Sequence, residues 1–496
     1  MLPYKTLITI DREARQPVYQ QIANRFASLI REGVLKPGLL LPGSRVLALQ
    51  LGLHRKTVVA AYDELVSQDW ATALPRKGVM VATNLPDIRP RSFQAPASPY
   101  AAGPGFSFNS IPSVATSRYD RLQSGQLIIN DGFADMREAP LEAWMKESRA
   151  LVRRPRYHQR LTYGSAMGSL HLRQQLVHYL THTRGLSLSA DNVMTTRGAQ
   201  MAIYLTAAML LEKGDYVIVG SPGYFYADLC FEQLGARLLR VPTDAEGIDA
   251  EEVGRLCRTH KVRMLYVIPH HHHPTTVTLS AERRMRLLDI IRTHRLAVLE
   301  DDYDYDYHYS SAPILPLASG DHGGNVIYVG SFTKLLGLSI RSGFLVAPAP
   351  FLEEMARLRK LMDLQGDNLP EETLAALLAD GTIDRHLKKS NKLYHERRDQ
   401  LTQLLQNRLG DKVRFTEPAG GMATWLTFHK RYPLTQVAVK AAAMGLLMSN
   451  GEQYGHGTWP LNAIRFGFAS LNNRELAKAV GILEKVLTQS AQRFGK

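Results

Sequence analysis

Five short apolar segments between residues 193 and 330 constrain the fold more than any other feature of the chain. They are VMTT (193–196), YVIVG (216–220), MLYVIP (264–269), AVLED (297–301) and VIYVG (326–330). Each is followed by polar, Gly or Pro residues and then by a helical pattern. Apolar strands that alternate with helices are typical of a mainly parallel sheet covered by helices on both faces. The sequence therefore predicts a large α/β domain, with a helix-rich end from about residue 350 and one late strand at 423–428.

The first eighty residues have a different pattern. Residues 17–31 place apolar side chains on one face of a helix, namely Val18, Ile22, Phe26, Leu29 and Ile30. Segment 41–68 predicts two short helices that are separated at Gly52, with Ser44 as the N-cap of the first. Two such helices form a helix-turn-helix. Segment 69–83 predicts a β-hairpin around Pro75–Gly78, which would form a wing.

A chain of 496 residues is too long for one small core, so at least two domains are expected. Residues 84–125 contain six prolines among Ser, Ala and Gly and show little periodicity, which indicates an extended linker. We predict a winged helix-turn-helix domain over residues 1–83, a linker over 84–125 and the α/β domain over 126–496.

Charge favours nucleic acid as the partner of the first domain. The chain carries a net charge of +14, and no acidic residue occurs between Glu32 and Asp63. Recognition helices present their amino-terminal residues to bases and phosphates, and a wing reaches an adjacent backbone or groove. The predicted DNA-binding residues are Arg45, His54, Arg55, Lys56 and Thr57 in the two helices, with Arg76 and Lys77 in the wing. The alternative is a solvated basic face that binds no DNA.

Lys334 lies in GSFTKLLGLSIRSG (330–343), directly behind an apolar strand. Its amine would project from the carboxyl edge of the sheet, where α/β folds bind ligands. Ser331, Thr333 and Arg341 offer hydroxyl groups and a fixed cation for a phosphate. A second strand ends before a helix whose free N–H groups would complete an anion cup, and the residues at this helix start are Gly198, Ala199 and Gln200.

Two further segments complete the needs of one cofactor, pyridoxal phosphate (PLP). PLP requires a lysine for a Schiff base, an anion cup, a partner for its pyridine nitrogen and a group stacked on its ring. In AVLEDDYDYDYHY (297–309), Asp301 can keep the ring nitrogen protonated and Tyr303 can bond the ring oxygen. Tyr224 in SPGY (221–224) is the stacking candidate.

Two clusters suggest a metal ion, and we predict that neither binds one. The carboxylates Asp302, Asp304 and Asp306 lack the spacing of a calcium loop. The histidines 270–273 have no matching Cys/His set at ligand spacing. We instead place His273 at the polar rim of the cofactor pocket.

Other features indicate where the protein works. The chain has only two cysteines, Cys230 and Cys257, which suits a reducing compartment. Its amino terminus lacks the apolar core of a signal peptide, and its apolar runs are shorter than a membrane span. We therefore expect a soluble cytoplasmic protein with no membrane partner.

The motifs also carry a resemblance to known families. LPGSR (41–45) and LGLHRKTV (51–58) resemble the winged helix of GntR-type bacterial regulators, with His54 in place of the usual serine. Residues 126–480 resemble fold type I aminotransferases. The whole chain is similar to MocR/GabR-type regulators, which join these two parts. Their motifs match Tyr163-Gly164, Gly168 and Leu172-Arg173, and also 222–224, 301–304 and 331–334.

The resemblance implies a homodimeric, PLP-dependent transcriptional regulator. It implies Lys334 as the imine lysine, Asp301 on the pyridine nitrogen and Tyr303 on the ring oxygen. It also implies Arg465 on the carboxylate of an amino-acid-like effector and Tyr163 on the phosphate of a partner subunit.

Three functions remain open at this point. In the first, an amine or amino acid reacts at the Lys334 aldimine and changes binding to operator DNA. In the second, the chain is a working aminotransferase that carries a DNA-binding domain. In the third, it senses PLP itself. His272, His273 and Gly220-Ser221 depart from the family pattern, which leaves the effector unidentified.

Overall fold

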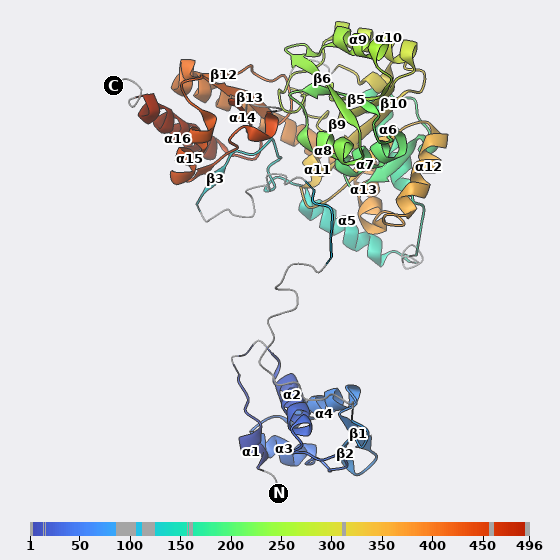
Figure 1. Cartoon of the computed structure of the whole chain (residues 1–496), viewed down its shortest axis with the longest axis vertical. Helices are drawn as coiled ribbons and strands as arrows, with labels where there is room; N and C mark the ends of the chain where they lie inside the picture. The colour runs from blue at the N-terminus through green and yellow to red at the C-terminus, as the bar shows by residue number, and fades with distance from the viewer. Residues whose placement is uncertain are drawn as a thin grey trace. The chain divides into compact units, whose positions relative to one another are not determined.

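The computed structural model describes residues 3–12, 14, 16–85, 106–111, 125–155, 157, 162–309, 314–455 and 461–491. The chain divides into two compact units, residues 1–109 and 110–496 (Figure 1). The predicted linker lies largely outside the described residues, so its bounds remain a prediction. No helix of the described residues is long and apolar enough to cross a membrane.

The first unit is a winged helix-turn-helix. Its helices are α1 (Tyr4–Leu7), α2 (Val18–Arg31), α3 (Ser44–Leu51) and α4 (Arg55–Ser67), and its antiparallel hairpin is β1 (Ala71–Leu74) with β2 (Gly78–Val81). The predicted apolar face of α2 is confirmed, since Ile22 and Phe26 are fully buried against α4. Gly52 ends α3 in the left-handed region, at φ 62°. The N-cap prediction was wrong by one residue, because α3 begins at Ser44 and its cap position is Gly43.

The second unit is built on one eight-stranded sheet, in the order β4-β11-β10-β9-β8-β5-β6-β7. The five predicted strands are confirmed as β4 (Val193–Thr196), β5 (Tyr216–Ser221), β8 (Val262–Val267), β9 (Ala297–Asp302) and β10 (Val326–Ser331). Neighbours from β10 to β6 (Arg237–Asp244) are parallel, while β11 (Gly343–Val346) and β7 (Gly247–Ile248) are antiparallel additions that the sequence did not predict.

Helices cover both faces of this sheet, as predicted for a parallel α/β domain (Figure 1). One face packs against α7 (Ala199–Leu210), α8 (Phe225–Gln233) and α12 (Ala349–Lys360). The other face packs against α9 (Ala250–Thr259) and α10 (Ala281–His294). A third cluster lies where α5 (Leu141–Arg153), α6 (Leu170–Arg184) and α13 (Asn368–Ala379) meet the β4 end of the sheet.

The carboxyl-terminal part forms its own apolar core. Its elements are α14 (Thr382–Leu409), β12 (Val413–Arg414), β13 (Ala423–Phe428), α15 (Leu434–Ala443), β14 (Leu446–Leu447), β15 (Ala463–Gly467) and α16 (Asn473–Ala491). The strand predicted at 423–428 is confirmed as β13, which pairs antiparallel with β15. Strand β3 (Leu127–Ile128) pairs with β14, so the chain joins this part directly after the predicted linker.

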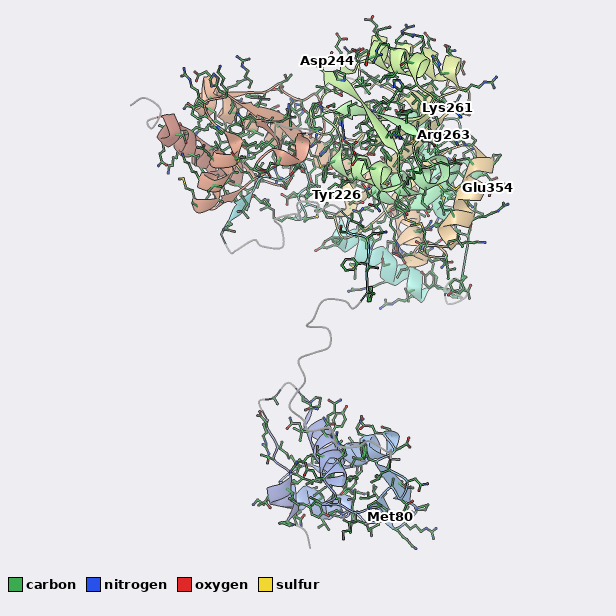
Figure 2. All side chains as sticks on the ribbon, in the orientation of Figure 1. Met80, Tyr226, Asp244, Lys261, Arg263 and Glu354 are labelled. Carbon is green, nitrogen blue, oxygen red and sulfur yellow. The ribbon has the colours of Figure 1, made fainter. Side chains whose placement is uncertain are left out.

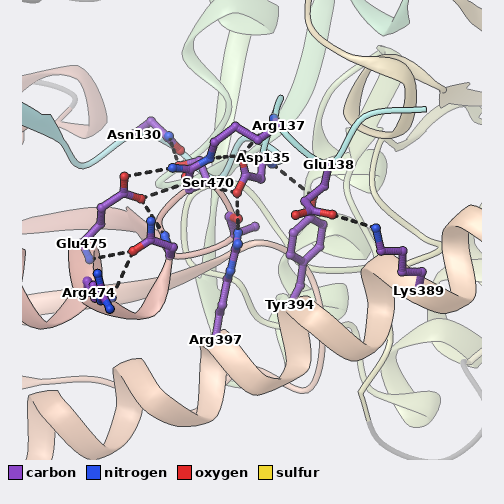
Figure 3. Close-up of polar contacts among 12 residues, drawn as sticks. Asn130, Asp135, Arg137, Glu138, Lys389, Tyr394, Arg397, Ser470, Arg474 and Glu475 are labelled. Carbon is purple, nitrogen blue, oxygen red and sulfur yellow. Dashed lines mark hydrogen bonds and ion pairs between the residues drawn. The ribbon is translucent and has the colours of Figure 1, made fainter. Parts of the chain in front are cut away.

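Residues 130–138, which we call the 130–138 segment, follow β3 and are fixed by polar contacts (Figure 3). Arg397 of α14 donates to Asp135 Oδ2 at 2.9 Å, and both side chains are at least 94% buried. Arg137 bridges the carboxylates of Asp135 and Glu475. The Asn130 carbonyl accepts from the N–H of Gly467 at 2.8 Å. The carboxyl-terminal part therefore sets the position of the 130–138 segment.

Candidate functional site

Lys334 lies on the single turn α11 (Thr333–Leu336), directly after β10. Its amine donates a hydrogen bond to the carbonyl of Gly132 and stands 4.6 Å from the ring centre of Phe133. Removal from water and the nearby charge of Arg465 lower the pKa of Lys334 to about 8. A lowered pKa leaves more of the amine neutral near pH 7, and the neutral form is the nucleophile.

Asp301 is buried near the end of β9 and has one unsatisfied oxygen. Its Oδ2 accepts from the hydroxyl of Tyr266 at 2.8 Å, whereas Oδ1 has no hydrogen-bond partner within the described parts of the chain. Burial raises the pKa of Asp301 to about 7. A charged N–H donor placed at Oδ1 would satisfy the carboxylate and restore its ionised form.

An anion cup lies between α7 and α11. Gly198, at φ 83°, precedes α7, and a Cβ atom built on it would lie 2.7 Å from Arg341 Nη2 and 3.3 Å from Thr333 Oγ1. Thr333 Oγ1 is buried and has no partner among the described residues. Ser331 Oγ accepts from the N–H of Thr333 at 3.2 Å. The glycine thus keeps open a space beside a guanidinium, a free hydroxyl and the start of a helix.

The helix start itself is accessible. Ala199 and Gln200 are the first two residues of α7, and both are partly exposed. Oε1 of Gln200 has no hydrogen-bond partner in the structure as described. The sequence predicted that the backbone N–H groups of these residues belong to the anion cup, and they lie at the start of α7 beside it.

Aromatic side chains form the wall of the pocket. The ring of Tyr224 lies 5.1 Å from that of His273, edge to face, and His273 lies 6.5 Å from Tyr303. Burial, with the charges of Arg465 and Lys334, lowers the pKa of His273 well below its usual value. His273 is therefore a neutral ring between the two tyrosines that the sequence proposed for the cofactor. The ring of Tyr226, which is labelled in Figure 2, lies 5.8 Å from that of Tyr224.

Arg465 of β15 is buried, with 1% of its surface exposed. Its Nε donates to the carbonyl of Asp131 at 2.9 Å and its Nη2 to the hydroxyl of Tyr303 at 2.8 Å. Nη1 donates to the carbonyl of His272 at 3.3 Å. The arginine predicted for the effector thus lies beside the predicted ring-oxygen tyrosine, and its donors are used by the protein.

Tyr163 is 81% exposed and lines a cavity of about 480 Å³. The other lining residues include Gly164, His171, Gln174, Gln365 and Glu371. Its predicted contact with the phosphate of a partner subunit stays a prediction.

The sequence missed several residues of this site. Asp131 contacts Arg465, which lies 334 positions later. Gly132 and Phe133 contact Lys334, which lies about two hundred positions later. The only local signal is the Asn-Asp-Gly sequence at 130–132, which indicates a turn rather than a pocket. Tyr266 was read only as a strand residue.

The four-histidine run makes structural hydrogen bonds. His270 Nδ1 lies 3.2 Å from Asp302 Oδ1, and His271 Nδ1 lies 3.0 Å from Asp304 Oδ1. Asp302 is the last residue of β9 and Asp304 follows it, so both carboxylates have a structural partner. They tie the 270–273 loop to the strand that carries Asp301.

The predicted DNA-binding residues are exposed or partly exposed in the first unit. Arg45 lies at the start of α3, and Arg55 and Lys56 lie at the start of α4. His54 caps α4, since its Nδ1 accepts from the N–H of Lys56 at 3.2 Å. Thr57 is partly exposed, and Arg76 and Lys77 are exposed at the tip of the hairpin.

Two family models match the two units. The model for class I and II aminotransferases matches residues 127–483, which is more than half of the chain. The chain belongs to the class I and II aminotransferase family. The model for bacterial regulatory proteins of the gntR family matches residues 18–81. An aminotransferase domain thus follows a GntR-type winged helix, as predicted.

Relatives share this arrangement over nearly their full length. The chain is 28% identical to the probable rhizopine catabolism regulatory protein MocR of Rhizobium meliloti, over 96% of this chain and 95% of that protein. It is 26% identical to the pyridoxine biosynthesis transcriptional regulator PdxR of Corynebacterium glutamicum, over 91% of each.

The structure of LysN, an α-aminoadipate aminotransferase of Thermus thermophilus, matches with a TM-score of 0.70 at 25% identity, over 76% of this chain and 96% of that one.

The residues of the aminotransferase domain fit PLP. Asp301 has a free oxygen for the pyridine nitrogen, and Thr333 and Arg341 face the space that Gly198 leaves for the phosphate. Lys334 presents an amine of lowered pKa. The LysN structure holds N-(5'-phosphopyridoxyl)-L-leucine, a PLP derivative. PLP is the cofactor of this domain.

Proposed function

We propose that the protein is a homodimeric transcriptional regulator that binds operator DNA through its winged helix and senses an amine or amino acid at its PLP site. The observation that carries the proposal is that an aminotransferase domain whose pocket fits PLP follows a GntR-type winged helix on one chain. The relatives that match over nearly the whole chain are named as regulators.

Each pocket residue has a distinct part in this proposal. When bound, PLP supplies an aldehyde that reacts reversibly with primary amines. Lys334 holds the cofactor through its amine, and Asp301 keeps the ring nitrogen protonated. Tyr303 orients the ring oxygen, and Tyr224 with His273 covers the ring. Arg341, Thr333 and the start of α7 hold the phosphate.

The 130–138 segment offers a route from the pocket toward the winged helix. The free amine of Lys334 donates to the carbonyl of Gly132, and Arg465 donates to the carbonyl of Asp131. The amine that would hold PLP is the same amine that donates to Gly132. The state of Lys334 thus favours one position of the segment that follows the linker, which is the differential contact that a switch needs.

Exposed apolar side chains support the homodimer. On α5, Leu141, Met145 and Val152 share one face and are 44%, 51% and 54% exposed. The turn after α12 exposes Leu361 and Leu364 at 85% and 52%. Contiguous exposed apolar side chains mark protein interfaces. A partner that covers them would also approach Tyr163.

The test uses the full chain, PLP and DNA fragments that the protein selects from a random pool. We expect Lys334→Ala to lose the visible absorption band of the bound cofactor and the effect of amines on DNA affinity. Lys389→Ala removes an exposed lysine and should keep both. If Lys334→Ala keeps an amine-dependent change in DNA affinity, sensing through Lys334 is wrong. If PLP alone changes DNA affinity and amines do not, the protein is a cofactor sensor.

A working aminotransferase is the second candidate, and the intact pocket favours it. In this function the Lys334 amine would move the proton at a bound amine, and Asp301 would keep the ring nitrogen protonated. Sustained conversion of an amino acid and a keto acid at about 1 per second or faster would support this function. A single conversion that stops would support the regulator.

A further inference from the structure

Asp131 is a carboxylate that the PLP-binding machinery leaves without a task. Its backbone lies between the two cations of the pocket, because its own carbonyl accepts from Arg465 and the next carbonyl accepts from Lys334. Its charge opposes the lowering of the Lys334 pKa by burial and contributes to the raised pKa of Arg465. The carboxylate is therefore close enough to act on whatever reacts at Lys334.

The carboxylate is held in place but not saturated. The hydroxyl of Tyr454 donates to Oδ1, and Gln453 Nε2 donates to Oδ2 at 3.1 Å. An ionised carboxylate has about four acceptor positions, so two donors leave capacity for a ligand. Asp131 is also partly exposed, whereas Tyr454 is buried.

Aromatic rings surround the same space. The ring of Tyr454 lies 6.3 Å from that of His273, which in turn contacts Tyr224 at 5.1 Å. Phe133, two residues after Asp131, lies beside the Lys334 amine. Aromatic faces next to a carboxylate attract ammonium groups and offer nothing to an anion.

The cation that would attract an anionic group is already engaged. Arg465 gives its donors to three carbonyl groups and to Tyr303, and Asp304 Oδ2 lies 4.0 Å from its Nη2. A ligand carboxylate would have to displace one of these contacts and approach Asp131. A ligand cation would displace none of these contacts and would favour the ionised form of Asp131, whose pKa is raised by burial. Its attraction to Asp131 would have to exceed its repulsion by Arg465.

We propose that Asp131 is a specificity-determining residue and that the effector is a primary amine with a second cationic group, such as a diamine. One amine would take the place of the Lys334 amine on the aldehyde carbon of PLP, so that one C–N double bond forms as the bond to Lys334 breaks and the lysine leaves as a free amine. The second amine would be held by Asp131 and the rings of Tyr454 and His273. This inference rests on the proposed function, since it names the ligand class of the same site.

The test compares putrescine with butylamine, which has the same carbon chain and one amine. Titrations of the full-length, PLP-loaded protein, followed by visible absorption and calorimetry, give the ratio of their dissociation constants. We expect putrescine to bind about ten- to a hundredfold tighter, as for one charge-assisted hydrogen bond. Asp131→Asn should bring the ratio to about one. Glu452→Gln removes an exposed carboxylate from the same loop as Tyr454 and should keep the wild-type ratio.

The outcomes separate this inference from the proposed function. If both amines change the spectrum and bind equally well to the wild type, the inference is overturned and amine sensing stands. If Asp131→Asn weakens both amines by the same factor, Asp131 has only a structural role. If putrescine, butylamine and amino acids all leave the spectrum and the DNA affinity unchanged, amine sensing fails and the inference fails with it. The ratio of the two dissociation constants for the wild type tests the preference for a diamine even if Asp131→Asn does not fold.

Discussion

The carboxylate of Asp301 is buried, and one of its oxygens is unpaired in the described structure. The ionised carboxylate that PLP binding needs therefore destabilises the protein without cofactor. Its raised pKa, about 7, means that the folded chain binds a proton that the unfolded chain releases near pH 4. Stability without cofactor should therefore fall as pH rises between these values, and stay low above them.

We predict that Asp301→Asn stabilises the cofactor-free protein by roughly 2 kcal/mol at pH 8 and weakens PLP binding at least about tenfold. Chemical unfolding and spectral titration measure the two effects. The stability difference should vanish near pH 4, where the wild-type carboxyl is also neutral. A variant that binds PLP as tightly as the wild type would remove Asp301 from its proposed role.

The rate of PLP loading at Lys334 should rise with pH, whereas the stability that depends on Asp301 falls. With a pKa of about 8, roughly a tenth of its amine is neutral at pH 7 and half at pH 8. We expect the rate of PLP loading to rise with pH and to level off above about 8, as measured by stopped-flow absorption. Because Asp131 raises this pKa, Asp131→Asn should move the midpoint to lower pH. A midpoint near 10.5 would mean that Lys334 is not desolvated.

At the level of elements, α4 and the hairpin should act through phosphate contacts. Lys56 and Lys77 are exposed and come from different elements. We predict that Lys56→Ala and Lys77→Ala each reduce the slope of log K against log salt by about 1. Lys5→Ala removes an equally exposed lysine of α1 and should leave the slope unchanged. Fluorescence anisotropy between about 50 and 200 mM salt measures it.

The buried ion pair of Asp135 and Arg397 holds the 130–138 segment in place and stabilises the fold. Although burial alone raises the pKa of Asp135, hydrogen bonds from Arg137 and Arg397 hold it below its usual value. We expect Asp135→Asn to lower the free energy of unfolding by about 3 kcal/mol at pH 7, because it leaves the buried Arg397 uncompensated. The effect should disappear only as pH falls below about 4.

Glu138→Gln is the control for this prediction, because Glu138 pairs with Lys389, which is 71% exposed (Figure 3). We expect its effect on the free energy of unfolding to be within about 0.5 kcal/mol. Equal effects of the two substitutions would mean that the Asp135 pair does not hold the segment.

Sequence predicted the elements that depend on local pattern. Strands β5, β8, β9 and β10 are buried on both faces, so their apolar runs mark them clearly. Strand β6 mixes polar with apolar residues and includes Pro242, so it lacks a clear apolar run. Strand β11 has only four residues, and the first of them is a glycine. The pairs β3 with β14 and Asp131 with Arg465 join residues over three hundred positions apart. Such pairings depend on tertiary packing, which no local pattern encodes.

For the whole molecule, the proposed dimer interface makes the last prediction. Val152 on α5 and Val439 on α15 (Leu434–Ala443) are exposed apolar residues, at 54% and 72%, but only Val152 belongs to the face with Leu141 and Met145. A glutamate in a covered apolar interface loses its water without gaining a partner, which costs several kcal/mol. On the surface of a monomer the same change is nearly neutral.

We therefore expect Val152→Glu to shift the protein from dimer to monomer in analytical ultracentrifugation, and Val439→Glu to leave the dimer intact. If Tyr163 completes the phosphate site of the partner, the Val152→Glu monomer should also bind PLP more weakly, although Val152 contacts no cofactor group. A dimer that survives Val152→Glu would place the interface elsewhere. A monomer with unchanged PLP affinity would instead remove Tyr163 from the partner's site and leave each pocket complete within one chain.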